Sequence, residues 1–68
     1  MEKIGSIIKE RRKALSITQR ELAALSGTGI NTLTKIERGA ANPSLKVIIN
    51  ILNTLGLEID LIIKNNKL

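Results

Sequence analysis

The stretch Thr18–Gly39, TQRELAALSGTGINTLTKIERG, carries the pattern of two short helices joined by a tight turn. A Thr-x-x-Glu pattern at its start is the capping box that satisfies free amides at a helix N-terminus. We therefore expect a helix over residues 18–26, closed by Gly27 in the left-handed backbone conformation. A second helical pattern of apolar residues begins two residues later, and we expect it to span residues 29–38.

The length of the turn limits how these two helices can be arranged. Helices joined by so few residues, with glycine among them, cross at a steep angle, as in a helix-turn-helix. Spacing alone also allows two neighbouring helices of an ordinary bundle. Further helices are expected at about residues 4–15 and, between Pro43 and Gly56, at residues 44–55. The chain is thus expected to be one mainly α domain over residues 1–68.

The C-terminal segment 57–64 differs, because its apolar and polar residues alternate. Alternation and a high isoleucine content favour a β-strand, although Ile59, Ile62 and Ile63 also fit the stripe of a fifth helix. A lone strand has no partner within this sequence, so we expect it to pair with the same strand of a second copy. The residues expected to make this homodimer contact are Leu57, Ile59, Leu61 and Ile63, ahead of a polar tail at 65–68.

Composition restricts the classes of function. The 68 residues include no Cys and no His, so we expect no disulfide and no thiolate or imidazole metal site, and a reducing compartment. The absence of Phe, Trp and Tyr argues against modules that stack unpaired bases on aromatic rings. A net charge of +5 suits a polyanionic partner. No nucleophile–base pair or phosphate-cradling loop is recognisable, so neither an enzyme nor a cofactor is expected. No membrane span or signal peptide is recognisable, and we expect a cytoplasmic protein.

The polar face of the helix expected at residues 29–38 suits the major groove of B-DNA, where the base pairs present distinguishable hydrogen-bonding patterns. Phosphate contacts are expected from helix N-termini, whose free amides attract anions, and from nearby polar or basic side chains. The alternative for each residue is a solvated helix surface with no ligand. We expect base contacts from Ile30, Asn31, Thr32 and Lys35. We expect phosphate contacts from Thr18, Gln19, Arg20, Thr28, Gly29, Thr34, Arg38, Asn42 and Lys46.

Several motifs agree in order and spacing with one known family. They are Ile4-Gly5 with Ile8, Arg11-Arg12-Lys13, Thr18-Gln19-x-Glu21-Leu22-Ala23, Gly27, Leu33 through Ile36-Glu37-Arg38-Gly39, Pro43-Ser44-Leu45 and Leu55-Gly56. Over about residues 4–56 the chain resembles the Cro and phage-repressor (XRE-type) helix-turn-helix family. The resemblance implies a four-helix, lambda-repressor-like domain, a phosphate contact by Gln19 and an internal ion pair between Arg12 and Glu37. The chain departs from the family at Gly29, where many members have a polar capping side chain.

The C-terminal segment narrows the resemblance. A helix followed by a strand is similar to the HipB-type antitoxins, which pair that strand across a homodimer. This implies a repressor that binds an inverted-repeat operator in double-stranded DNA, autoregulates a type II toxin–antitoxin operon and binds a HipA-type kinase toxin. Two alternatives stay open. One is a stand-alone phage-type or restriction-controller repressor without a toxin, and the other is a protein-interaction module that uses the same fold.

Overall fold

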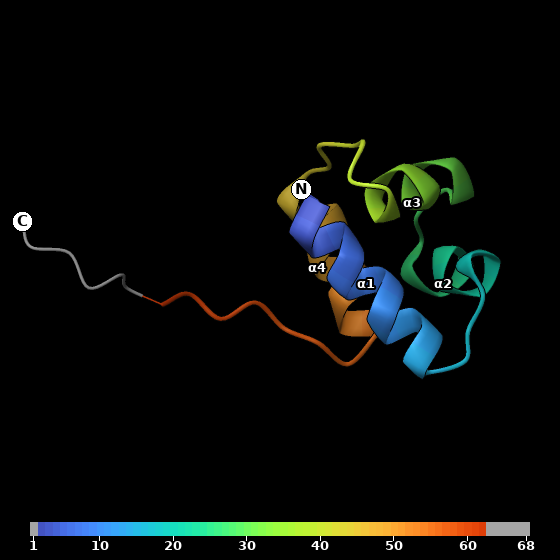
Figure 1. Cartoon of the computed structure of the whole chain (residues 1–68), viewed down its shortest axis with the longest axis horizontal. Coiled ribbons are helices and arrows are strands. Elements are labelled where there is room, and N and C mark those ends of the chain that lie inside the picture. The colour runs from blue at the N-terminus through green and yellow to red at the C-terminus, as the bar shows by residue number, and fades with distance from the viewer. Residues whose placement is uncertain (1, 63–68) are drawn as a thin grey trace, which may run out of the picture.

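The computed structural model describes residues 2–62, which form four α-helices (Figure 1). They are α1 (Glu2–Ala14), α2 (Gln19–Ser26), α3 (Ile30–Glu37) and α4 (Leu45–Thr54). α1 packs against α3, and α2 packs against both α3 and α4. The mainly helical, four-helix fold expected from the sequence is therefore confirmed. None of the helices within residues 2–62 has the length and hydrophobicity needed to cross a membrane.

The core between the helices is built from aliphatic side chains. Burying one such side chain stabilises a fold by roughly 1.5–3 kcal/mol. Each helix contributes at spacings that place its apolar residues on one face. Partly buried residues from the first helix, the loops and the segment after α4 pack around this core. Its buried members are Ile8, Leu22, Ala23, Leu33, Ile36, Ile48, Ile51, Leu52 and Leu55.

The link between α2 and α3 has the local geometry that its sequence predicts. The Thr18 hydroxyl accepts the Glu21 amide at 3.0 Å, and the Glu21 carboxylate accepts the Thr18 amide at 2.8 Å, which completes the capping box. Gly27 closes α2 with a φ of 71°, in the left-handed region that glycine adopts without a steric penalty. α3 begins only three residues after this cap, so the two helices form a helix-turn-helix.

The first helix begins earlier than expected. It starts at Glu2 rather than Ile4, and it runs through Gly5, a residue type that weakens helices. The physical reason is close packing. A methyl group added at Gly5 would collide with the carbonyl oxygen of Ile36 near the end of α3. Glycine therefore lets α1 approach the backbone of α3, and this contact outweighs its low helix propensity. The other helices begin and end within one residue of the expected bounds.

The segment after α4 begins against the helical body and then leaves it (Figure 1). Gly56 ends the helical region with a φ of 72°, and the Arg11 Nε atom donates to the carbonyl oxygen of Leu55 at 3.0 Å. Leu57 still packs against the core. Residues 57–62 then form neither helix nor strand in this single chain, and they lead away from the helical body (Figure 1). The fifth helix is thus absent from the described residues, and the intermolecular strand, whose last residues 63–64 lie outside them, stays a prediction.

Replacing Gly5 with alanine should lower the free energy of unfolding by about 1–3 kcal/mol, because α1 and α3 must separate to admit the methyl group. Urea unfolding followed by circular dichroism measures this change. Gly29→Ser is the matched control, since Gly29 has a φ of −63° and the nearest atom to an added Cβ is 3.9 Å away. Equal stability of Gly5→Ala and the wild type would refute the close contact.

Candidate nucleic-acid interface

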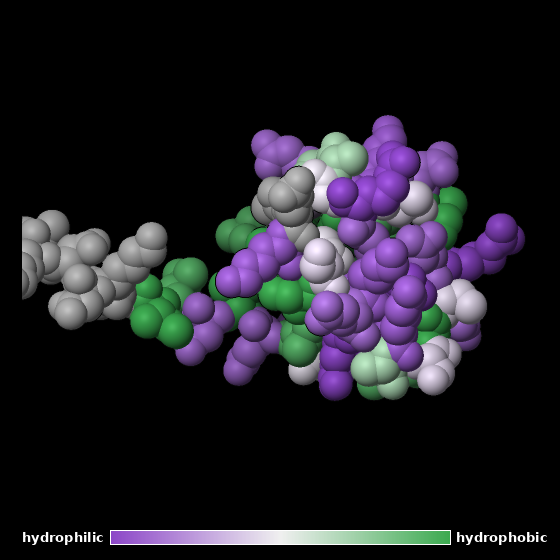
Figure 2. All heavy atoms as spheres, viewed as in Figure 1, coloured by the Kyte–Doolittle hydropathy of each residue, from purple (hydrophilic) through white to green (hydrophobic). Residues whose placement is uncertain are grey.

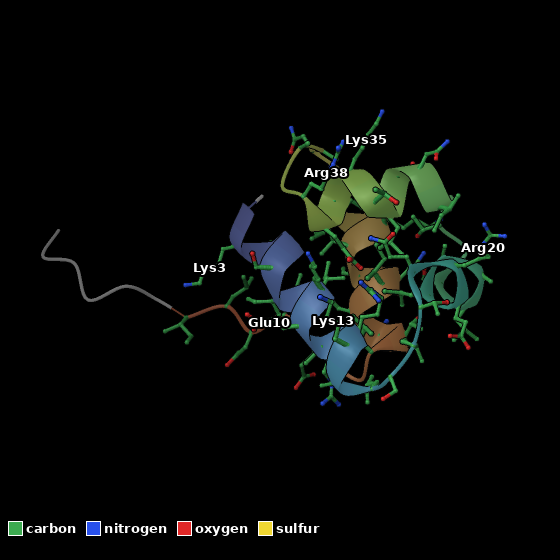
Figure 3. The ribbon with its side chains drawn as sticks, turned by 45° about the vertical axis from the view of Figure 1, so that its right-hand side comes forward. Lys3, Glu10, Lys13, Arg20, Lys35 and Arg38 are labelled. Carbon is green, nitrogen blue, oxygen red and sulfur yellow. The ribbon has the colours of Figure 1, made fainter. Side chains whose placement is uncertain are left out.

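α3 divides its residues between the core and the solvent. Leu33 and Ile36 are buried, and they anchor the helix on α1 and α2. The four residues expected to contact bases are all exposed to solvent, and Ile30, at the start of the helix and at the edge of this exposed face, is 39% exposed. Lys35 projects away from the helical body (Figure 3). The residues that the structure gathers on this face are Ile30, Asn31, Thr32 and Lys35.

The N-terminus of α2 presents free backbone amides. The first backbone hydrogen bond of this helix runs from Leu22 to the carbonyl of Thr18, at 3.0 Å. The backbone amides of Gln19 and Arg20 come before this first hydrogen bond. They have no carbonyl partner, because no helical turn precedes them. The positive end of the helix dipole is at the same place. The side chain of Arg20 is exposed and extends outward (Figure 3). This corner can bind an anion such as a phosphate.

Several of the residues expected to contact phosphate already use hydrogen-bond donors within the chain, among them the backbone amide of Thr18, which donates to the Glu21 carboxylate at 2.8 Å. The backbone amide of Thr28 donates to the carbonyl oxygen of Ala23 at 3.0 Å. The hydroxyl of Thr34 donates to the carbonyl oxygen of Ile30 at 2.9 Å, and a hydroxyl has one hydrogen to donate. The Thr34 hydroxyl is therefore less able to donate to a phosphate than the sequence suggested, and Thr28 can donate only through its hydroxyl.

The remaining expected phosphate contacts lie around the ends of α3. Gly29 caps its N-terminus without a side-chain hydrogen bond. Arg38 follows its last residue, and Figure 3 shows Arg38 on the same side of the molecule as Lys35. Asn42 and Lys46 are exposed in the following loop and in the first turn of α4. The candidates for base and phosphate contacts thus come from the starts of α2, α3 and α4, from Arg38 after the end of α3 and from the loop before α4.

A buried ion pair fixes α1 to the end of α3. The Nε and Nη2 atoms of Arg12 donate to the two carboxylate oxygens of Glu37 at 2.7 and 2.9 Å. The side chains are 10% and 2% exposed. Arg12 also donates through Nη1 to the carbonyl oxygen of Ile17 at 2.9 Å, in the loop before α2. The ion pair implied by the family resemblance is present, and it joins three parts of the fold.

Both charges are held in their ionised forms. Burial disfavours the Glu37 carboxylate, but hydrogen bonds from Arg12 and Gln19 and the positive charges of Arg12 and Lys9 outweigh this, so its pKa lies below the ordinary 4.5. The hydrogen bond to Glu37 raises the pKa of Arg12, an effect that desolvation opposes and the negative charge of Glu37 reinforces. A buried pair of this kind holds two elements in place, because separating the partners would leave an unpaired charge in the core.

Gln19 belongs to the same network, which the sequence did not indicate. Its Nε2 atom donates to Oε1 of Glu37 at 3.0 Å, and its Oε1 lies 3.3 Å from the hydroxyl of Thr34. The contact of Arg11 with the end of α4 was also missed. The partners are 15 or more residues apart, so no local spacing could have paired them. The only sign of these contacts in the sequence was that Gln19 and Arg11 carry side chains able to donate hydrogen bonds.

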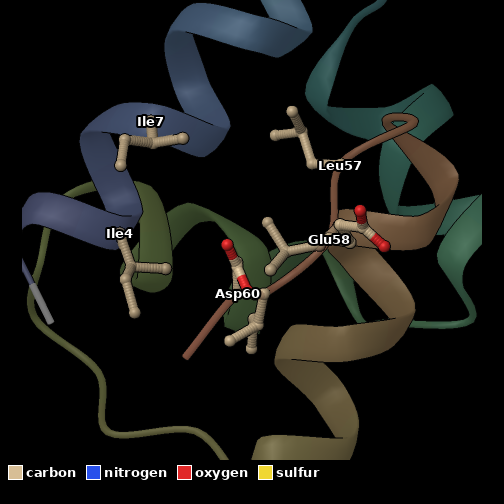
Figure 4. A pocket seen from close by; sticks show the side chains of 7 residues that line it. Ile4, Ile7, Leu57, Glu58 and Asp60 are labelled. Atoms are coloured by element: carbon tan, nitrogen blue, oxygen red, sulfur yellow. The ribbon is translucent and has the colours of Figure 1, made fainter. Parts of the chain in front are cut away.

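A second surface feature lies elsewhere, between the start of α1, the end of α4 and the segment that follows it. It is an open groove of about 320 Å³, with aliphatic side chains along its walls and two carboxylates beside it (Figure 4). Figure 2 likewise shows a largely hydrophilic helical body and hydrophobic residues where the C-terminal segment leaves it. No group of three His, Cys, Asp or Glu residues within 2–62 could hold a metal ion. The groove is lined by Ile4, Ile7, Leu52, Leu57, Glu58, Ile59 and Asp60.

The four-helix fold, together with the exposed polar face of α3, is typical of helix-turn-helix proteins. The chain belongs to the helix-turn-helix family, whose model matches residues 8–62. This agrees with the XRE-type resemblance of the sequence motifs.

The relatives of the chain include proteins described as transcriptional regulators. An uncharacterized HTH-type transcriptional regulator of Sinorhizobium fredii, y4mF, is 30% identical over 59 residues, which cover 87% of this chain and 78% of the relative. A second uncharacterized HTH-type transcriptional regulator, from Methanothermobacter thermautotrophicus, is 40% identical over 53 residues, or 78% of this chain and 77% of the relative. The chain is thus similar to both regulators over most of their length.

One solved structure shares the fold at a similar level of identity. It is the crystal structure of the restriction-modification controller protein C.AhdI from Aeromonas hydrophila, with a TM-score of 0.80 and 35% sequence identity. The match covers 84% of this chain and 86% of that chain. None of these three relatives is described as an antitoxin, so the resemblance to HipB-type proteins rests on the sequence pattern of the C-terminal segment.

The ion pair makes the stability of the protein dependent on pH. Since the pKa of Glu37 is lower in the folded chain than its ordinary 4.5, its stabilising contribution is complete above that value and is lost as the pH falls through the folded-state pKa. Glu37→Gln should therefore be less stable than the wild type by about 3 kcal/mol at pH 7, and the difference should shrink toward pH 3. Denaturant unfolding at several pH values measures it. A difference that is the same at pH 7 and pH 3 would contradict the ion-pair account.

Proposed function

We propose that the protein is a transcriptional regulator that binds specific sequences in double-stranded DNA and represses as a homodimer on an inverted-repeat operator. One observation carries this proposal: the exposed face of α3 presents Asn31, Thr32 and Lys35, while the buried face of the same helix is fixed by the core and by Glu37. Membership of the helix-turn-helix family and similarity to HTH-type transcriptional regulators support it. A regulator of this kind acts in the cytoplasm, on the nucleoid.

The groups on this surface suit two tasks in DNA recognition. Asn31 can make paired hydrogen bonds to adenine, Lys35 can donate to guanine, and Ile30 can touch a thymine methyl group. Phosphate contacts position the protein without reading sequence. The free amides of Gln19 and Arg20, together with their side chains, suit such a contact at the start of α2, and Arg38 suits one beyond the end of α3.

Two copies are needed for an inverted repeat. We propose that residues 57–64 pair across the two-fold axis, which would place the two α3 helices about 34 Å apart on one face of the DNA. The exposure of Leu61, at 89%, supports this, because an isolated chain leaves a large apolar side chain in water. The alternation of apolar residues along the segment gives one face to a partner strand. Leu57 instead contacts its own core, which leaves Ile59, Leu61 and Ile63 as the pairing residues that we favour.

Two types of regulator are candidates, and a different observation favours each. Similarity to C.AhdI favours a controller-like repressor without a toxin. An autoregulating HipB-like antitoxin with a HipA-type kinase partner is the second candidate, favoured only by the alternating pattern of residues 57–64. Purification of the tagged protein from its native lysate separates the two, because only an antitoxin should retain a kinase-sized partner in equal amounts.

Selection of bound duplexes from a random pool tests the proposed function as a whole. If the protein is a DNA-binding homodimer, the selected duplexes should be enriched in an inverted repeat whose half-sites are about 10 base pairs apart. Binding to these duplexes should weaken steeply as the salt concentration rises. A pool that shows no enrichment, with weak binding that is insensitive to salt, would instead support a protein-interaction module.

Lys35→Ala should weaken binding to the selected operator by about 1–3 kcal/mol and relax the preference at one base pair in each half-site. Fluorescence anisotropy with the operator and with its single-base variants measures both effects. Lys3→Ala is the matched control, because Lys3 is an exposed lysine on α1, on another side of the molecule from Lys35 (Figure 3). If Lys35→Ala weakens binding to operator and random duplex equally, Lys35 does not read bases.

Leu61→Lys should convert the dimer to a monomer without lowering the stability of the helical domain, since Leu61 contacts little of its own chain. Light scattering or analytical ultracentrifugation over a range of concentrations measures the change. Leu25→Lys is the control, because Leu25 is also an exposed leucine, at 68%, but lies on α2. A Leu61→Lys variant that remains dimeric would rule out pairing through this segment.

A further inference from the structure

The carboxylate of Glu37 contacts more than its ion-pair partner. Oε1 accepts hydrogen bonds from Nη2 of Arg12 at 2.9 Å and from Nε2 of Gln19 at 3.0 Å. Gln19 is the first residue of α2, at the corner where the free amides lie, and Glu37 is the last residue of α3. One buried carboxylate therefore joins the end of α3 to a side chain at the start of α2.

The chemistry of this contact determines which way the Gln19 amide points. A carboxylate held ionised by an arginine can only accept hydrogen bonds, so it must face the NH2 end of the amide. The amide oxygen then faces Thr34, whose hydroxyl lies 3.3 Å away. An NH2 group has two hydrogens, and Glu37 takes one of them. Within residues 2–62 the second hydrogen has no acceptor, and Gln19 is only partly buried, so this hydrogen is available to an outside anion.

We propose that Glu37 is a positioning residue for phosphate binding: it holds the NH2 end of Gln19 at the N-terminus of α2, so that the second N–H of the amide and the free backbone amides donate to the same DNA phosphate. This inference rests on the proposed function and names a part of its mechanism. Arg12 supports the arrangement by keeping Glu37 ionised and fixed. The ion pair thus preorganises a DNA contact as well as the packing of α1 on α3, and an ordered donor loses less entropy on binding.

Binding of a labelled random-sequence duplex of about 20 base pairs at low salt tests this role, because a phosphate contact affects all sequences alike. Glu21→Gln is the matched control, since it removes the same charge from an exposed position on α2 and keeps a residue that fits the capping box. Loss of a carboxylate alone strengthens binding to a polyanion, so Glu21→Gln should bind about twofold more tightly. Glu37→Gln should bind about fivefold more weakly, because the amide of Gln19 is no longer held in one orientation.

The same measurement in a Gln19→Ala background separates positioning from general damage to the fold. If Glu37 acts through Gln19, adding Glu37→Gln to Gln19→Ala should change binding by less than about twofold. A fivefold loss that persists in the Gln19→Ala background would overturn the proposal, and so would a Glu37→Gln variant that binds as tightly as Glu21→Gln.

A spectroscopic readout on the wild type keeps the proposal testable if Glu37→Gln does not fold. Gln19 is the only glutamine in the chain, so selective 15N-glutamine labelling gives one side-chain amide signal. Its order parameter should approach that of rigid backbone, about 0.85, whereas the exposed Asn31 side chain, followed in a second sample labelled with 15N-asparagine, should lie below about 0.6. A Gln19 amide as mobile as that of Asn31 would overturn the positioning role. A rigid Gln19 in a protein that binds no duplex would instead remove the proposed function, and the phosphate contact with it.

Discussion

The buried ion pair between Arg12 and Glu37 is the interaction on which the rest of this small structure depends. Two charges enclosed in an aliphatic core are tolerated only when each is fully paired, and here both oxygens of the carboxylate accept from the guanidinium. The third guanidinium nitrogen, Nη1, donates to the carbonyl oxygen of Ile17 and so holds the loop before α2. Because shifting any of these elements would expose an unpaired charge to an apolar environment, the relative positions of α1, α2 and α3 are narrowly defined.

The packing around this pair explains why α3 can present a polar face. Leu33 and Ile36 insert into the core, and Gly5 lets α1 approach the last carbonyls of α3. A helix of eight residues has little stability of its own, so its order comes from these tertiary contacts. The exposed side chains of α3 consequently contribute little to stability, and polar residues that suit a ligand are tolerated there. The proposed DNA contact uses this separation between the two sides of one short helix.

Much of the fold could be predicted from the sequence, because its signals are local. The capping box formed by Thr18 and Glu21 marks the start of α2, and Gly27 marks its end and the turn that follows. Each signal involves residues no more than four positions from the helix end that it defines. The pairing of Arg12 with Glu37 is 25 residues apart and came only from the family resemblance. The Gln19 contacts and the collision that excludes alanine at position 5 could not be predicted, because they depend on how the helices pack. The strand pairing that we propose for residues 57–64 has the same limit, since its hydrogen-bonding partner would be a second chain.

The DNA contact that we propose lies on the exposed face of α3 and not on α1, where Lys9 and Lys13 are exposed. The most direct measurement is a titration of the 15N-labelled protein with a short duplex, followed by amide chemical shifts. The largest changes should occur at Ile30–Lys35 and at Gln19 and Arg20, with small changes at Lys9 and Lys13. Changes centred on Lys9 and Lys13 that leave Ile30–Lys35 unaffected would contradict it.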